Sequence, residues 1–156
     1  MMKTTFNNLI NIEYPDDFKI LTEKENAKYF NGDLLRLTFQ NKDKHLLISI
    51  AKTRNSFLNR LFGIKTILDG AISNMAKNLK EFDIIEGYNS VIFNKPALTK
   101  CFSYLTTKEE IKQYGEFSVF KIKNAFYNVY CLSRFEDKDE YKDLFKQFRD
   151  SFTEIR

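Results

Sequence analysis

The chain has 156 residues, of which 43% are hydrophobic and 29% are charged, proportions that are ordinary for one globular domain. Its formal net charge is +4, and no run of five or six like charges indicates a nucleic-acid or membrane patch. No stretch is apolar over the length of a membrane span, and the first 15 residues lack a signal-peptide pattern. We therefore expect a single cytoplasmic domain over residues 1–156, without nucleic-acid binding or membrane insertion.

The first third of the chain predicts strands. Residues 7–14 alternate along the chain until a proline ends the pattern, and residues 18–21 form a short second piece. Residues 34–40 and 45–51 are two apolar runs joined by the polar loop Asn41–Lys44, which predicts a hairpin. Residues 23–28 are polar and are expected to form a loop.

Residues 55–82 predict one long helix. Apolar residues recur there at spacings of three or four, which places them on a single face of a helix. They are Phe57, Leu61, Ile64, Leu68, Ile72, Met75, Leu79 and Phe82. Such a face most simply packs on a sheet.

The opposite face of this helix carries a stripe of small and polar residues. It contains Asn59, Gly63, Thr66, Gly70 and Ser73. An exposed glycine costs a helix roughly 0.5–1 kcal/mol relative to alanine. Either the chain tolerates two such residues, with or without a kink, or the smooth stripe lets another backbone approach. On the second interpretation the candidate partner-binding patch is Asn59, Phe62, Gly63, Thr66, Ile67 and Gly70.

Residues 96–135 predict three consecutive antiparallel strands around which the rest of the chain is organised. The strands are expected at 100–106, 116–123 and 125–135, after a short strand at 90–93. Cys101 and Cys131 fall in the first and third strands, so a middle strand separates them by about 9–10 Å. That distance is too long for a disulfide, and we expect two buried free thiols.

Residues 137–155 predict a C-terminal helix that docks on the domain. Its apolar stripe consists of Tyr141, Leu144, Phe145, Phe148, Phe152 and Ile155. The intervening residues Lys142, Asp143, Lys146, Arg149 and Asp150 are expected to face water.

The sequence shows no pattern typical of a catalytic, metal or cofactor site. His45 is the single histidine, and no serine or cysteine nucleophile motif accompanies it. One histidine and two distant cysteines do not make a standard zinc site, and the five glycines form no phosphate-binding loop. We therefore expect no enzyme activity and no cofactor, although carboxylates can catalyse without histidine.

Three short motifs carry a family resemblance. They are Glu13-Tyr14-Pro15-Asp16-Asp17-Phe18, then Asn94-Lys95-Pro96-Ala97, and finally Tyr141, Phe145, Phe148, Ser151 and Phe152 at the chain's end. With the predicted order of elements, the chain resembles the PsbP-like superfamily, which includes DcrB-like proteins and Mog-type Ran-binding proteins. All three motifs are packing motifs.

The resemblance implies an α+β fold. It is expected to be an α/β/α sandwich in which helices at about 55–82 and 137–155 cover a central antiparallel sheet. It also implies a non-enzymatic binding role, since members include photosystem factors, a small-GTPase partner, bacterial envelope proteins and cytoplasmic chaperones for secreted effectors. The first hypothesis is a cytoplasmic adaptor or chaperone, monomeric or homodimeric, that binds another protein. The second is a binder of a small lipid-like ligand in an aromatic-lined cavity between the sheet and the long helix.

Overall fold

The computed structural model of the chain describes residues 1–30, 34–53 and 61–156. The strands are β1 (Met2–Phe6), β2 (Ile10–Tyr14), β3 (Lys19–Ile20), β4 (Leu35–Asn41), β5 (Leu46–Lys52), β6 (Lys80–Ile92), β7 (Lys95–Leu105), β8 (Lys112–Ile122), β9 (Ala125–Arg134) and β10 (Thr153–Glu154). The helices are α1 (Glu23–Asn26), α2 (Ile64–Asn78) and α3 (Lys138–Asp150), and a 3-10 turn, η2 (Phe135–Asp137), precedes α3.

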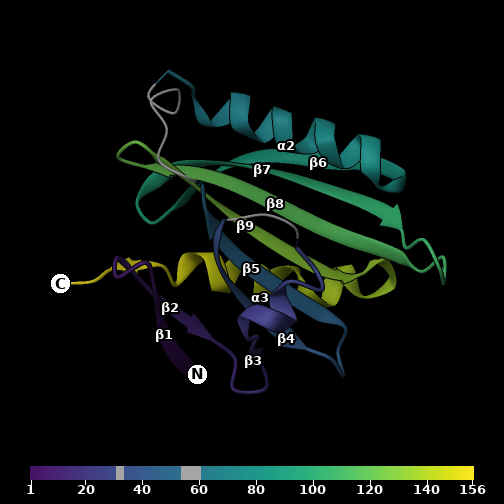
Figure 1. Cartoon of the computed structure of the whole chain (residues 1–156), viewed down its shortest axis with the longest axis horizontal. Helices are drawn as coiled ribbons and strands as arrows, with labels where there is room; N and C mark the ends of the chain where they lie inside the picture. Colours follow the sequence, from purple (N-terminus) through teal and green to yellow (C-terminus); the bar gives the residue numbers. More distant parts are fainter. Residues whose placement is uncertain (31–33, 54–60) are drawn as a thin grey trace.

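The strands form two antiparallel sheets. The larger sheet has seven strands in the order β3-β4-β5-β9-β8-β7-β6, and the smaller has three in the order β1-β2-β10. The helices α2 and α3 lie on opposite sides of the larger sheet, and the small sheet lies beside the end of α3 (Figure 1). Among the described residues, every helix falls short of the length and hydropathy that a bilayer crossing requires.

The three strands predicted over residues 96–135 are confirmed as β7, β8 and β9, paired in sequence order. Their side chains alternate between two apolar clusters. Toward α2, the buried members are Leu68, Ile72, Phe102, Phe117, Val119 and Phe126, which we call the α2-side cluster. Toward α3, Phe145, Phe148 and Phe152 pack with Ile48, Phe120 and Val129, among others, in the α3-side cluster. The sheet is therefore buried on both faces, which explains why its strands are apolar on both sides.

The helix predicted over residues 55–82 is shorter than expected. Within the described residues α2 covers Ile64–Asn78, and residues 54–60 lie outside the described part of the chain. At Leu79 the backbone turns extended, with φ −101° and ψ 133°, and β6 begins at the next residue. Leu79 and Phe82 still contact the α2-side cluster, so the apolar spacing continues across the change from helix to strand.

The C-terminal helix is also shorter than predicted, because α3 ends at Asp150 rather than at residue 155. The last residues turn back and form β10, which pairs with β2 through Thr153 and Glu154. The hydroxyl of Ser151 accepts a hydrogen bond from the backbone N–H of Glu13 at 3.0 Å and helps to fix this turn.

The N-terminal segment differs from the prediction at two places. Residues 7–14 do not form one strand, because Asn7 and Asn8 adopt positive φ values of 55° and 52° and make the turn between β1 and β2. The expected polar loop at 23–28 contains α1, which begins with a capping box between Thr22 and Glu25.

The short strand predicted at 90–93 is the last part of the 13-residue β6.

Candidate functional site

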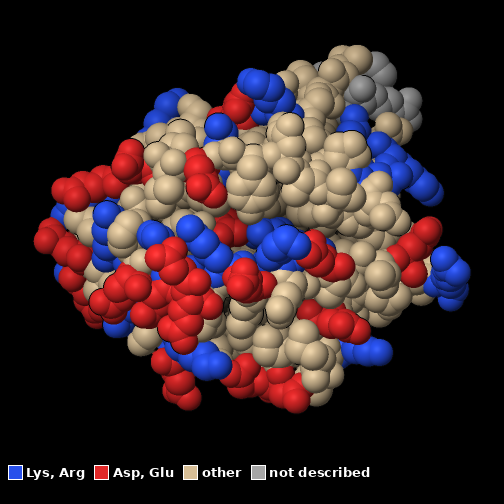
Figure 2. Space-filling model, turned by 180° about the vertical axis from the view of Figure 1, so that it is seen from behind, with Lys and Arg blue, Asp and Glu red and all other residues tan. Residues whose placement is uncertain are grey.

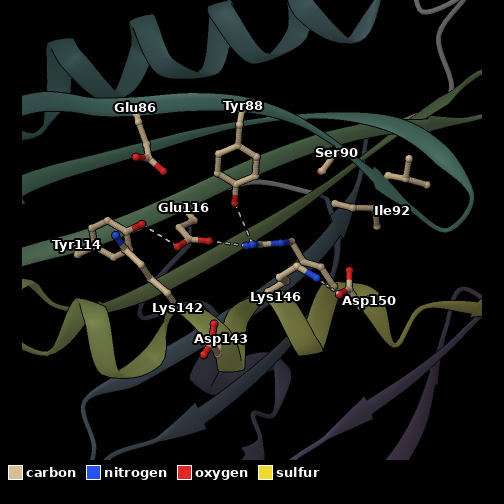
Figure 3. A pocket seen from close by; sticks show the side chains of 12 residues that line it. Glu86, Tyr88, Ser90, Ile92, Tyr114, Glu116, Lys142, Asp143, Lys146 and Asp150 are labelled. Carbon is tan, nitrogen blue, oxygen red and sulfur yellow. Dashed lines mark hydrogen bonds and ion pairs between the residues drawn. The ribbon is translucent and has the colours of Figure 1, made fainter.

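A groove runs between β6, at the edge of the large sheet, and α3. It encloses about 210 Å³. One wall is formed by Glu86, Tyr88, Ser90, Val91 and Ile92 of β6, the other by Lys142, Asp143, Lys146, Arg149 and Asp150 of α3, and Tyr114 and Glu116 of β8 form the floor. In Figure 3 Glu86 and Tyr88 of β6 point toward α3, Lys142 of α3 points toward Tyr114, and Lys146 extends along the helix to Asp150.

The floor of the groove holds a buried ion pair. Arg149 Nη1 donates to Glu116 Oε1 at 2.6 Å, and the two side chains are only 6% and 4% exposed. The Tyr114 hydroxyl donates to Glu116 Oε2 at 2.7 Å, and Arg149 Nη2 donates to the Tyr88 hydroxyl at 3.0 Å (Figure 3). Both charges are thus hydrogen-bonded as well as paired, as buried charges must be to persist in a protein interior.

The sheet register places Glu116 between the two cysteines. Glu116 pairs with Cys101 of β7 on one side and with Cys131 of β9 on the other. Both cysteines are buried and free, which confirms the prediction for the thiols. Arg149 Nη1 also lies 4.0 Å from the sulfur of Cys131. Glu116 therefore lies on the central strand of the meander, on the face that α3 covers.

The local environment fixes the protonation states in this cluster. Burial raises the pKa of Cys101 to about 11 and that of Cys131 to about 12. Burial likewise raises the pKa of Tyr88 to about 12. Burial alone would lower the pKa of Arg149, but Cys131, Glu116 and Tyr88 together raise it above its usual value. Near neutral pH the thiols and the phenol keep their protons, so neither cysteine supplies a thiolate nucleophile.

The rim of the groove carries charges of both signs, and they differ in their partners. Lys146 pairs with Asp150 at 2.6 Å, and Lys142 lies 3.4 Å from Asp139. Glu86 and Asp143 are exposed carboxylates that have no ion pair or hydrogen bond within the described residues. Two negative charges on the rim therefore lack a counter-ion.

Within the described parts of the chain, no group of three or more His, Cys, Asp or Glu side chains is arranged to hold a metal ion. The groove therefore offers two kinds of charged group. On its floor, Glu116 and Arg149 form a fully hydrogen-bonded ion pair. On its rim, the carboxylates of Glu86 and Asp143 have no ion-pair partner among the described residues.

The patch predicted on the long helix lies elsewhere, on the outer surface of α2. Gly63, Thr66 and Gly70 are exposed, and Phe62 retains 40% of its surface. Ile67 is only partly buried and contacts the α2-side cluster. Asn59 lies outside the described residues. A Cβ added at Gly63 or Gly70 would meet no heavy atom within 4 Å, so the space above both glycines is open.

Sequence reasoning missed the groove residues. Arg149 was expected to face water, and that expectation is wrong because its guanidinium reaches the buried Glu116. One signal was available in the strand pattern: Glu116 has the same parity as Phe120 and Ile122, which are core residues of the α3 side. A carboxylate at such a position requires a buried cation, and the C-terminal helix supplies it.

Comparisons with known proteins establish the fold. No protein-family model matches the chain, and no curated protein sequence is significantly similar to it. The solution structure of cyanobacterial PsbP (CyanoP) from Synechocystis sp. PCC 6803 superposes with a TM-score of 0.71 at 11% identity, over 99% of this chain and 92% of that one. A variant of the protein Mog1 gives a TM-score of 0.60 at 6% identity, over 97% and 95% of the two chains.

A third structure, LpqN of Mycobacterium tuberculosis, is involved in cell envelope biogenesis. It gives a TM-score of 0.56 at 16% identity, over 94% of this chain and 83% of that one. The chain therefore has the PsbP-like fold that it shares with Mog1, as the sequence motifs indicated. At these identities the likeness concerns the fold alone.

Proposed function

We propose that this PsbP-like domain, an α/β/α sandwich over residues 1–156, is a non-enzymatic protein-binding module that acts as a cytoplasmic adaptor or chaperone. Its partner-binding patch lies around the start of α2 and comprises Phe62, Gly63, Thr66, Ile67 and Gly70. Asn59 belongs to the patch by its place in the sequence and lies outside the described residues. The protein itself is a monomer or a homodimer.

The exposed apolar surface at the start of α2 supports this proposal. Leu61 and Phe62 are 68% and 40% exposed, and Gly63 follows them with open space above it. Large apolar side chains gathered at an exposed site are typical of a contact surface for another protein. Gly63 is the N-cap of α2, a position at which glycine is readily tolerated because it lies outside the helix interior. Gly70 lies inside α2, where glycine has a lower helix propensity than alanine. The open surface above Gly70 therefore comes with a cost in helix stability.

The second hypothesis, a lipid-like ligand between α2 and the sheet, has less support. The aromatic rings that were expected to line a cavity there pack on one another, with ring centroids 5.1 Å apart for Phe82 and Phe102 and 5.9 Å apart for Phe102 and Tyr130. A Cβ added at Gly115 would stand 2.5 Å from the Phe102 ring. Such close packing favours a core over a ligand chamber.

The proposal is tested by affinity capture from a lysate of the source organism, read by mass spectrometry. Wild-type protein and two variants, Gly63→Arg and Gly70→Arg, are compared. A matched control, Ala76→Arg, adds the same side chain to another exposed position of α2. We expect a stoichiometric partner on wild type and control, and its loss from both glycine variants. Retention of that partner by correctly folded glycine variants would remove the patch assignment.

A further inference from the structure

The strand β6 is the terminal strand of the seven-stranded sheet. Its 13 residues pair with β7 on one side, and no other described strand pairs with it. The register is irregular up to Glu86 and continuous from Glu86 to Ile92. Long open edges of this kind offer unpaired N–H and C=O groups to any extended chain, and proteins usually shorten, cover or disrupt them. The bulges disrupt only the first half of β6.

The side chains along this edge have two different characters. Glu86, Tyr88 and Ser90 point into the groove shared with α3, as Figure 3 shows. Val91 is 62% exposed and borders the groove as well. Gly87 and Asn89 alternate with the groove-facing residues and lie on the opposite face, where the side chain of Lys100 lies over Gly87. An added strand would therefore place alternate side chains against the groove rim that includes Glu86 and against a face on which Lys100 is the nearby charge.

The charge of the groove indicates what kind of side chain would enter it. Lys142 and Lys146 are paired with Asp139 and Asp150, while Glu86 and Asp143 have no partner among the described residues. Seen from behind the view of Figure 1, acidic and basic side chains are mixed along the lower half of the molecule, and acidic ones gather at its left end (Figure 2). A cation opposite Glu86 would compensate a charge that no described residue pairs with.

A second copy of β6 fits this edge poorly. Residues Gly87–Ile92 contain no lysine or arginine, so a copy aligned on the regular part of the strand would offer Glu86 no cation. Pairing along the whole strand about its midpoint would set Glu86 directly opposite the Glu86 of the other copy. Like charges directly opposite one another destabilise a strand pair.

We propose that residues Glu86–Ile92 of β6 bind an extended segment of a partner protein as an additional strand, with a lysine or arginine opposite Glu86 entering the groove beside α3. The inference rests on the proposed protein-binding function but uses a surface other than the α2 patch. The segment carries uncharged or apolar residues at the alternate positions, where it contacts the face of β6 that includes Gly87 and Asn89.

The test uses a display library of random 12-residue peptides selected on the full chain. The best binders are synthesised, and their Kd values are measured by fluorescence anisotropy on wild type, Glu86→Lys and Asp43→Lys. Asp43 is an exposed carboxylate in the turn between β4 and β5 and does not line the groove, so its variant makes the same change in net charge outside the proposed site. Amide hydrogen exchange then locates the bound peptide.

We expect the selected peptides to share a basic residue flanked by apolar or β-branched residues. Glu86→Lys should weaken their binding roughly fivefold or more, and Asp43→Lys should change it less than twofold. A peptide whose basic residue is replaced by glutamate should regain binding on Glu86→Lys. Among Gly87–Ile92, the backbone amides that point away from β7 should exchange more slowly in the complex.

Three results would overturn the inference. Peptides that bind regardless of Glu86→Lys and lose binding on Gly70→Arg would leave the protein-binding function intact and place it on α2 alone. A library that yields no binder would count against both proposals. A wild-type dimer in sedimentation that becomes monomeric on Asn89→Pro would show that a second copy occupies the edge.

Discussion

Glu116 of β8 and Arg149 of α3 form a 2.6 Å ion pair in which both side chains are almost excluded from solvent. The pair joins the middle strand of the meander to the C-terminal helix across 33 residues of sequence. Tyr114 and Tyr88 complete the hydrogen bonding of the two charges. The interaction thus fixes the position of α3, and with it one wall of the groove.

Removal of one member of this pair should destabilise the domain strongly. Arg149→Met leaves the Glu116 carboxylate buried without a cation, and we expect the free energy of unfolding to fall by about 3–5 kcal/mol. Replacement of both residues by methionine should cost less than the single change. Urea denaturation provides the values, and Lys146→Met, which breaks the exposed pair with Asp150, is the control. A cost for Arg149→Met no larger than for the control would contradict this account.

Two glycines should respond in opposite directions to substitution by alanine. A Cβ at Gly115 would lie 2.5 Å from the ring of Phe102, so Gly115→Ala should lower the free energy of unfolding by about 1–3 kcal/mol. At Gly70 the added methyl meets open space inside α2, so Gly70→Ala should raise it by about 0.5–1 kcal/mol. Thermal or chemical denaturation of the two variants checks both signs. Equal effects would show that the space around Phe102 adapts freely.

The strands of the central meander could be predicted because their residues alternate between two buried faces. The end of α2 could not be predicted, since Leu79 and Phe82 contact the same cluster as the helix and keep its spacing. The sequence between Gly70 and Gly87 also contains no proline or glycine that would mark the end of a helix. The length of β6 was missed for a related reason: an edge strand exposed on most of its residues shows no clear alternation.

The groove was harder to predict than the fold. A single sequence does not reveal that Glu116 and Arg149 meet, because their contact depends on where α3 crosses the sheet. Glu86 and Asp143 look like ordinary surface charges until the structure places them on one groove. Of the small-residue stripe predicted on the long helix, Thr66, Gly70 and Ser73 lie in α2, Gly63 is its N-cap, and Asn59 lies outside the described residues. The role of this stripe is a proposal.

The stability of the protein should decrease in alkaline solution because of the buried thiols. The folded state raises the pKa of Cys131 from its ordinary value of 9.0 to about 12. Above pH 9 the unfolded chain loses this proton while the folded chain keeps it. The free energy of unfolding should therefore fall between about pH 9 and pH 12, by at most about 1.4 kcal/mol per pH unit for each such group.

Cys101, whose pKa is raised to about 11, should contribute with the same sign. Urea denaturation from pH 8 to pH 11 measures the slope, and Cys131→Ala should make it shallower even if this variant is less stable throughout. An unchanged slope in Cys131→Ala would exclude the thiol as a source of the effect.

The same two thiols should remain unreactive and unpaired while the protein is folded. Cys101 and Cys131 lie on the two strands that flank Glu116, so two strand spacings, about 9–10 Å, separate them, beyond the reach of a disulfide. With side chains 1% and 0% exposed, they should react with Ellman's reagent only as the domain opens. We expect close to no labelling in native buffer, labelling of two thiols in denaturant, and no disulfide-linked band on a gel after diamide treatment.

Arg149→Met should accelerate labelling of Cys131, because Arg149 Nη1 lies 4.0 Å from its sulfur and holds α3 over it. Rapid labelling of the folded wild type would show that α3 leaves the sheet far more often than its buried ion pair implies.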